Sequence, residues 1–491
     1  MPNTIADSSF LDVMRFETEH QPRAYVNSVI RFHHTFTNAE RLQAAEKAGW
    51  NVFQFPSEML LGGDLLSDSG TTTLTAEQVA KMFLADEAYG SNYGYFELLK
   101  SFEKTFGIPQ ENFELYLFHQ GRAAEHTLFT QIGRWGNNQL IPNNGHFDTT
   151  RANIEANQIE AVDLFSPQLQ SGEEVPFGGN INVTALRQLL EEKGSRVPLV
   201  YITITNNTGG GQPVSLENIK AARAVCEEYG KPLFLDACRF AENSWFIKNR
   251  EAGFENKSIP SIVREIFSLC DGFTISLKKD GLSNMGGALL IKKNAPFLKT
   301  HPEFLNQLRD YQILTEGHPT YGGLTGRDIM TIATGLETVV QEEYLDSRVG
   351  QVRKFGERLQ SKGVPVLSPF GGHAIYLDMN RFFHDTQHKK EDFPGIAFTG
   401  LLLLKGVRLC ELGNFAFGKY NPETKKEILP KNNFVRAAIP RNKYEEQDLN
   451  YVADCVAALY ERRHAIPRAM PVYGRELTLR HFKARFQLEK I

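Results

Sequence analysis

The middle of the sequence passes from an apolar run through a glycine-rich loop and a helical segment to a second apolar run. Residues 199–204 and 232–236 have the composition of buried strands, whereas residues 215–229 repeat apolar side chains at helical spacing. Ser215 is placed to cap this helix and Gly230 to end it. A strand, a helix and a second strand in this order predict a parallel sheet with right-handed crossovers, whose sites lie at the carboxyl ends of the strands.

Two adjacent lysines, Lys278 and Lys279, lie between two further apolar runs, residues 272–275 and 288–291. Both runs predict buried strands, so the lysines are expected at a strand end close to the core. A buried amine is costly to keep charged, so its pKa tends to fall and it can act as a nucleophile toward a carbonyl group. A solvated turn is the alternative interpretation of this stretch taken alone.

The strand at residues 232–236 ends in Asp236, and Arg239 follows three residues later. Pyridoxal phosphate enzymes need a lysine that binds the aldehyde and a carboxylate that keeps the pyridine nitrogen protonated, so that the ring accepts electrons. Asp236 and Lys279, each at the end of a predicted strand, supply both groups. On these motifs the chain resembles the tryptophanase and tyrosine phenol-lyase family of β-eliminating lyases, from about Gln21 to the C-terminus.

The resemblance implies an α/β fold of the aspartate-aminotransferase type, fold type I of the pyridoxal phosphate-dependent transferase-like enzymes. It implies a large domain with a mostly parallel, seven-stranded sheet and a smaller α/β domain. We therefore expect an N-terminal arm at residues 1–20, a small domain formed by residues 21–66 and 341–491, and a large cofactor-binding domain at residues 67–340. A chain of 491 residues with 41% hydrophobic content is long enough for more than one domain.

Two longer segments have a helical pattern. Residues 38–49 predict a helix capped by Asn38 and ended by Gly49. Residues 328–359 predict a helical stretch that leads back to the small domain.

Charge and cysteine content exclude several classes of protein. The chain has 54 Lys and Arg against 58 Asp and Glu, a net charge of -4 and no run of like charges, so a small-molecule partner is expected rather than nucleic acid or a membrane surface. Residues 1–10 lack the features of a secretion signal, and no window approaches the ~18 apolar residues of a spanning helix. The odd number of scattered cysteines predicts reduced thiols in the cytoplasm and no structural zinc. These cysteines are Cys226, Cys238, Cys270, Cys410 and Cys455.

A phosphate site can be argued from residues 113–125. An alternating strand at residues 113–118 is followed by His119, Gln120, Gly121 and Arg122, and then by a helix. A glycine turn that leads into a helix N-terminus presents free N–H groups and a positive dipole end to an anion. The resemblance implies that Gln120, Gly121, Arg122 and Ser276 bind the cofactor phosphate.

The resemblance also assigns residues to the cofactor ring and the substrate carboxylate. It implies that Phe147 stacks on the ring, that Asp236 holds the pyridine N–H and that Arg239 lies beside the ring hydroxyl. Asn207 would touch this hydroxyl and the substrate carboxylate. An arginine in an apolar strand without an acid beside it, such as Arg436, usually binds a carboxylate, and a structural salt bridge is the alternative.

Residues from an early loop and from a neighbouring subunit are expected to complete the site. Ser67 matches a threonine of the substrate loop in the family. Tyr89 is implied to reach the cofactor phosphate and the reacting centre of a neighbouring subunit, so an obligate oligomer is expected, a homotetramer. Gly70, Glu87 and Asn284 match a site for a monovalent cation, K⁺ or NH₄⁺.

Asp148, His481 and Leu412 carry the choice of leaving group. All three take the form that the resemblance associates with tryptophanases, and Leu412 removes an arginine that helps phenol-lyases to hold phenol. Phe118 and Leu277 are expected to shrink or repolarise the pocket, whereas His318 is either a polar contact in the pocket or a solvated loop residue.

The expected reaction is β-elimination of an L-amino acid to pyruvate, ammonia and a released side chain. Lys279 would remove the α-proton, Tyr89 would act as an acid near the leaving group, and Lys278 would be a polar neighbour of the phosphate. Release of indole requires protonation of a ring carbon and a partner for the ring N–H, which suits Asp148 and His481. The residues favour L-tryptophan and leave open a tyrosine phenol-lyase, an S-substituted cysteine β-lyase and a catalytically silent homologue.

Overall fold

A computed structural model of the protein describes residues 29–171 and 173–491. It contains two compact units, residues 1–31 and residues 32–491. Of the first unit only residues 29–31 are described, and they are exposed. The predicted N-terminal arm and the first residues of the predicted small domain, 21–28, lie outside the described residues. Within the second unit, residues 32–491, the domain boundaries at 66/67 and 340/341 stay predictions.

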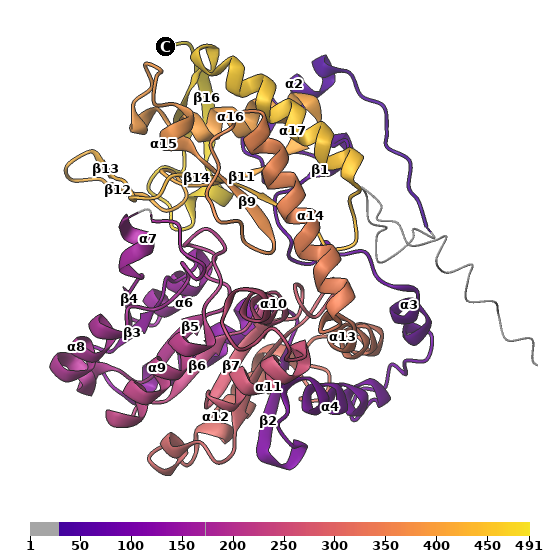
Figure 1. Ribbon diagram of the computed structural model, residues 1–491, viewed down its shortest axis with the longest axis vertical. Helices are drawn as coiled ribbons and strands as arrows, with labels where there is room; N and C mark the ends of the chain where they lie inside the picture. Colours follow the sequence, from indigo (N-terminus) through magenta and orange to yellow (C-terminus); the bar gives the residue numbers. More distant parts are fainter. Residues whose placement is uncertain (1–28, 172) are drawn as a thin grey trace, which may run out of the picture. The chain divides into compact units, whose positions relative to one another are not determined.

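A five-stranded mixed sheet lies at the centre of the larger layer (Figure 1). Three of its neighbouring strands are parallel, as expected, and the other two pairings are antiparallel. The reason for the reversal is the short connection of residues 277–286 between the last two strands in sequence, because a parallel crossover needs a dozen or more residues. In spatial order the strands are β2 (Phe113–Phe118), β8 (Gly287–Lys292), β7 (Gly272–Ser276), β6 (Leu233–Asp236) and β5 (Val200–Thr203).

Two more strands, β3 (Leu140–Asn143) and β4 (Glu160–Asp163), form a separate parallel pair beside β5. The side chain of Asn144 joins this pair to β5, since its amide nitrogen donates to the carbonyl of Thr203 (3.0 Å) and its oxygen accepts from the Thr203 N–H (2.8 Å). The layer thus holds the seven expected strands, but a side-chain amide replaces the backbone ladder between β3 and β5.

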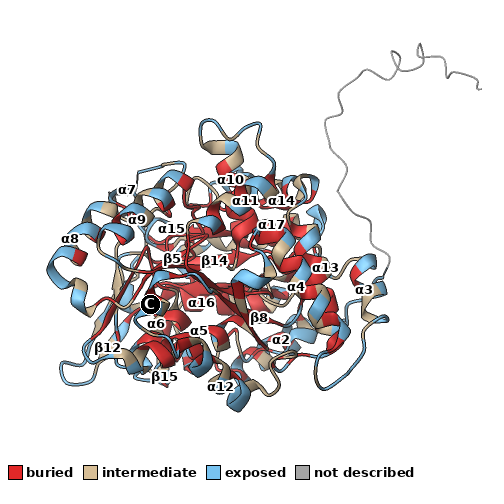
Figure 2. Ribbon diagram, turned by 90° about the horizontal axis from the view of Figure 1, so that it is seen from below, coloured by how far each residue is buried: buried red, intermediate tan, exposed pale blue. Residues whose placement is uncertain are grey.

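Alternate residues of the central sheet face two separate hydrophobic cores. Ile202 and Leu235 face one core, and Tyr201 and Phe234 face the other. Figure 2 shows the strands buried beneath helices whose outer faces are exposed. The first core is covered by α4 (Tyr93–Phe106), α8 (Val183–Lys193), α9 (Leu216–Glu228), α10 (Phe240–Arg250), α11 (Ile259–Ser268) and α13 (Gly326–Val339), and the second by α5 (Gly121–Ile132), α6 (Asp148–Ala156) and α12 (Phe304–Glu316).

A second antiparallel sheet and its own core are built mostly from the C-terminal third of the chain. The sheet has the order β11 (Cys410–Leu412), β14 (Phe434–Ala438), β9 (Ala374–Asp378). Helices α14 (Glu342–Ser361), α16 (Pro394–Leu402) and α17 (Glu446–Glu461) pack on it, and β1 (Gly63–Asp64) pairs with β10 (Val407–Arg408). The remaining elements are α2 (Asn38–Lys47), α3 (Ala76–Met82), α7 (Pro167–Ser171), α15 (Met379–Phe382), β12 (Lys419–Asn421), β13 (Lys426–Ile428), β15 (Arg468–Tyr473) and β16 (Arg485–Glu489).

Two helix predictions need correction. The single helical stretch at residues 328–359 is two helices, α13 and α14, because Gln341 is extended and acidic residues in the first turn of α14 favour a new helix start there. Helix α2 is capped by Thr37 rather than Asn38, since the Thr37 hydroxyl and the Glu40 carboxylate form a reciprocal capping box. Among the described residues no helix is both long and apolar enough to cross a membrane.

Candidate active site

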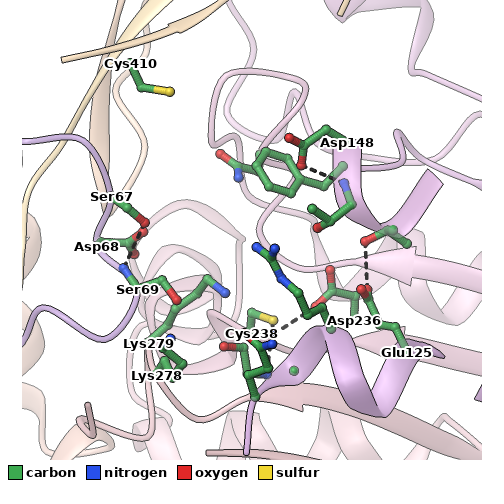
Figure 3. A pocket seen from close by; sticks show the side chains of 18 of the residues that line it. Ser67, Asp68, Ser69, Glu125, Asp148, Asp236, Cys238, Lys278, Lys279 and Cys410 are labelled. Carbon is green, nitrogen blue, oxygen red and sulfur yellow. Dashed lines mark hydrogen bonds between the residues drawn. The ribbon is translucent and has the colours of Figure 1, made fainter. Parts of the chain in front are cut away.

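A cavity of about 210 Å³ lies where the carboxyl ends of the sheet strands meet the second sheet. Figure 3 shows Lys278, Lys279, Asp148 and Asp236 around this cavity. It brings together most of the residues that the sequence predicted. These are Ser67, Gln120, Gly121, Arg122, Phe147, Asp148, Asn207, Asp236, Arg239, Ser276, Lys278, Lys279, Arg436 and His481.

The two lysines lie in the tight loop between β7 and β8. The Lys279 N–H donates to the carbonyl of Ser276 (3.3 Å), and the carbonyl of Lys278 accepts from Gly70 (2.7 Å), so local hydrogen bonds fix the loop. Burial lowers the pKa of Lys278, and the neighbouring positive charge of Lys279 lowers it further. Asp236 ends β6 on the same edge of the sheet, so an amine and a carboxylate line the same cavity.

The anion site predicted at residues 120–122 has the expected backbone. Helix α5 begins at Gly121 directly after β2, and its first N–H groups have no partner within the helix. A Cβ on Gly121 would lie 2.6 Å from the Cβ of Ser276, so only glycine lets the two segments approach this closely. The guanidinium of Arg122 forms no hydrogen bond with a described residue and is available to an anion in the cavity.

Arg436 is buried and forms no ion pair with any residue that the structure describes. Its Nη1 donates to Oδ1 of Asn207 (3.3 Å) and its Nη2 donates to the carbonyl of Leu66 (3.1 Å), whereas its Nε has no partner. The structural salt bridge considered for this arginine is therefore absent from the described residues. Its charge is free to bind a carboxylate in the cavity.

One end of the cavity is apolar except for a contact between Asp148 and His481. Phe53, Leu66, Leu412 and Phe482 are among the residues that line this end. His481 Nε2 lies 3.0 Å from Oδ2 of Asp148, and the other ring nitrogen of His481 is buried without a partner. An edge-on contact with Phe53 (5.7 Å between ring centroids) orients the imidazole.

Four predicted site residues lie outside this cavity. Tyr89 is 74% exposed, and its ring packs against His318 and Tyr321. The Asn284 amide donates to the carbonyl of Gly70 (3.1 Å), which brings these two predicted cation ligands together. Glu87 has other partners: its carboxylate accepts from the first N–H of α13 and pairs with Arg327 (2.9 Å).

The expectation that Phe118 and Leu277 would alter the pocket is wrong for this cavity, and His318 takes the loop position that was its alternative. Phe118 and Leu277 are fully buried in the two cores on opposite faces of the sheet. His318 bonds Thr320 (2.9 Å) in a loop beside Tyr89. None of the three is among the described residues that line the cavity.

The cavity contains carboxylates that the sequence analysis missed. Asp68 binds Arg239 through both carboxylate oxygens (2.7 and 3.0 Å). Burial alone would raise the pKa of Asp68. The neighbouring positive charges, of which Arg239 has the largest effect, instead hold this pKa well below its usual range. Burial, followed by the charge of Asp236, raises the pKa of Glu125 to about 8. A signal existed for Glu125, which lies one helical turn after Gly121 and so on the same face of α5. Asp68 had no such local signal.

Comparison with known proteins agrees with this geometry. A family profile described as "Beta-eliminating lyase" matches residues 64–455. A protein named tryptophanase from Salinibacter ruber is 42% identical over 91% of this chain and 91% of its own, and one named tyrosine phenol-lyase from Intrasporangium calvum is 36% identical over 92% of each. A solved threonine aldolase from Leishmania major, 16% identical, covers 81% of this chain and 99% of its own with a TM-score of 0.54, which confirms the expected fold class.

Proposed function

Because the chain belongs to the β-eliminating lyase family, we propose that it is a carbon–carbon lyase that uses pyridoxal phosphate to convert L-tryptophan to indole, pyruvate and ammonia. The observation that carries the choice of substrate is the Asp148–His481 pair at the end of an apolar, aromatic-lined part of the cavity. The apolar walls suit an indole ring, and the Asp148–His481 pair supplies the polar partners that its release requires. Leu412 places no charge there to hold a phenol.

The residues of the cavity fit pyridoxal phosphate. The glycine at the N-terminus of α5, with the free Arg122 and Lys278, suits a dianionic phosphate. Asp236 would hold the ring nitrogen, Phe147 would stack on the ring, and the Lys279 amine would bind the aldehyde. When bound, this cofactor supplies an electron sink for the carbanion that forms at the substrate α-carbon.

The protein's own residues would position the substrate and move its protons. Arg436 and Asn207 would bind the α-carboxylate of the substrate, and Ser67 would line the part of the cavity that holds this carboxylate. Lys279 Nζ would take the α-proton. The proton that the leaving carbon of indole needs would come from Tyr89, while the Asp148–His481 pair would hold the ring N–H.

The direct test is pyruvate release from L-tryptophan, L-tyrosine and S-ethyl-L-cysteine, measured by a coupled dehydrogenase. We expect kcat/KM for L-tryptophan to exceed that for L-tyrosine, because the Leu412 side chain that lines the apolar end offers no charge to hold a phenolate. Turnover of S-ethyl-L-cysteine alone would keep the β-elimination and remove the tryptophan assignment. No pyruvate from any of the three would favour the catalytically silent alternative.

We propose that the active site is shared between subunits of a homotetramer. Tyr89 is far more exposed than a residue that works in its own chain's cavity, and Phe83, Leu84 and Tyr93 are exposed in the same segment. Apolar side chains gathered on a surface are typical of an interface.

A mixing experiment tests this sharing. Tyr89→Phe and Lys279→Ala proteins should each be nearly inactive, but a refolded equimolar mixture should regain up to about one quarter of wild-type activity, because random hybrid dimers hold one intact site each. Sedimentation measures the oligomer in parallel. A mixture with no more activity than its parts would place Tyr89 and Lys279 of each working site in one chain.

We propose a site for a monovalent cation formed by oxygen atoms of Gly70, Glu87 and Asn284. A hydrogen bond already holds Asn284 beside Gly70. If contact between subunits brings Glu87 close to Gly70 and Asn284, the three residues complete the cation site. Potassium or ammonium should then activate the enzyme, and sodium should do so poorly. The measurement is kcat in chloride salts of matched ionic strength. Equal activity in potassium and sodium would remove this proposal.

We also propose a cytoplasmic location. All five cysteines, which lie within the described residues, are free. Free thiols are the rule in reducing compartments.

A further inference from the structure

Asn207 lies in the loop after β5 and is held at its side-chain oxygen by three neighbours. Tyr376 donates its hydroxyl to Oδ1 of Asn207 in a short hydrogen bond, and the same hydroxyl lies 3.1 Å from the Asn207 backbone carbonyl. Arg436 Nη1 and His373 Nε2 each lie 3.3 Å from Oδ1. The three contacts all gather on one atom of the carboxamide.

These contacts determine which way the carboxamide points. An arginine can only donate, so the atom that faces Arg436 must be the oxygen of Asn207. Burial raises the pKa of Tyr376 to about 12, so its hydroxyl keeps the proton that it donates. The amide nitrogen of Asn207 is therefore turned away from all three and is left as a donor toward the cavity that Asn207 lines.

Tyr376 is itself held firmly. It lies on β9 directly opposite Arg436 on β14, so the two side chains stand next to each other on one face of the sheet. Its ring packs edge-on against Phe434, with 5.8 Å between the centroids. On the other side the backbone of Gly211, with φ +72, lies so close that a Cβ there would be 3.2 Å from the Tyr376 ring.

We propose that Tyr376 is a positioning residue that fixes the carboxamide of Asn207, and through it Arg436, so that an N–H donor and a guanidinium together meet the carboxylate of an amino acid. Tyr376 is not among the described residues that line the cavity, so it acts on the ligand only through these neighbours. This inference rests on the proposed function for the identity of the ligand. It concerns binding, however, and does not depend on which side chain is eliminated.

The test is the affinity of the enzyme loaded with pyridoxal phosphate for L-alanine, which has a carboxylate but no leaving group and is followed by the absorbance change on binding. Tyr376→Phe should raise the Kd about tenfold, because the substitution removes about one buried hydrogen bond. In an Asn207→Ala background the same substitution should change Kd less than about twofold, since the group that Tyr376 positions is already gone. With the proposed substrate the effect should appear mainly in KM.

Tyr116→Phe is the matched control. It removes another fully buried hydroxyl, which donates to the carbonyl of Leu305 (2.8 Å) far from the lining of the cavity, and it should leave the Kd for L-alanine unchanged. An unchanged Kd in Tyr376→Phe, or equal losses with and without Asn207, would overturn the positioning role. Wild-type protein that binds neither pyridoxal phosphate nor L-alanine would overturn the proposed function and this inference with it.

Discussion

Replacing Lys279 with alanine is expected to reduce β-elimination by at least about 10⁴-fold, because one amine is asked both to hold the cofactor aldehyde and to take the α-proton. The loop around it should persist. Its backbone is fixed by hydrogen bonds that do not involve the Lys279 side chain, and Lys279 belongs to none of the hydrophobic cores of the described residues. Thermal unfolding should therefore stay close to that of the wild type.

The measurement is the visible absorbance of the protein with pyridoxal phosphate, before and after borohydride. In the wild type, borohydride should attach the cofactor irreversibly to a peptide that contains Lys279, whereas the variant should release it on dialysis. Lys278→Ala is the control, since it removes the neighbouring amine from the same loop and should leave the covalent attachment intact. Attachment that survives in Lys279→Ala and disappears in Lys278→Ala would reverse the roles of the two lysines.

The parts of this site that could be predicted from the sequence are those that follow from the order of strands and loops. Asp236 ends one apolar strand, Lys279 follows shortly after the end of a second, and Gly121 follows shortly after the end of a third. Because the ends of neighbouring strands meet at one edge of a sheet, three short local patterns were enough to bring these residues together. Gly121 could be assigned to a phosphate site from the strand-to-helix turn alone.

Errors arose where closeness in sequence was taken for closeness to the cavity. Leu277 directly precedes the lysines, and Phe118 lies two residues before Gln120, yet both side chains point into cores. Phe118 is the last residue of β2 and Leu277 follows the last residue of β7, whereas Gln120 and Lys279 lie farther along, where the chain has turned out of the sheet. A residue at the strand end is still packed against a core, and the sequence does not mark the residue at which the chain turns toward the cavity.

Contacts between distant parts of the chain gave no signal of their own. Asp68 and Arg239 are 171 residues apart, and Tyr376 and Asn207 are 169 apart. Taken alone, Asp68 looks like an ordinary polar residue of a loop and Tyr376 like an ordinary aromatic residue of a strand. Their pairing follows from the packing of the second sheet against the first, which no local pattern determines.

His481→Phe is expected to lower kcat/KM for L-tryptophan by about 10²–10⁴-fold and to leave S-ethyl-L-cysteine within about threefold of the wild type. Indole is a poor leaving group until a ring carbon is protonated, and the Asp148–His481 pair, 3.0 Å apart in an otherwise apolar end of the cavity, is the polar group placed to hold the ring N–H while that happens. A thiolate leaves without such help. The substitution keeps an aromatic ring packed on Phe53, so the shape of the cavity should change little.

The comparison within one variant separates chemistry from folding, because damage to the fold or to cofactor binding would lower both activities together. His301→Phe is the matched control: it makes the same replacement at a ring that stacks on Trp135 outside the lining of the cavity, and it should leave the ratio of the two kcat/KM values unchanged. Asp148→Asn keeps the volume of the carboxylate but removes its charge, so it should shift the ratio in the same direction as His481→Phe if the two residues act as a pair. Equal losses on both substrates in His481→Phe would mean that the imidazole supports the cavity rather than the departure of indole, and the apolar end would then have to be assigned to a different leaving group.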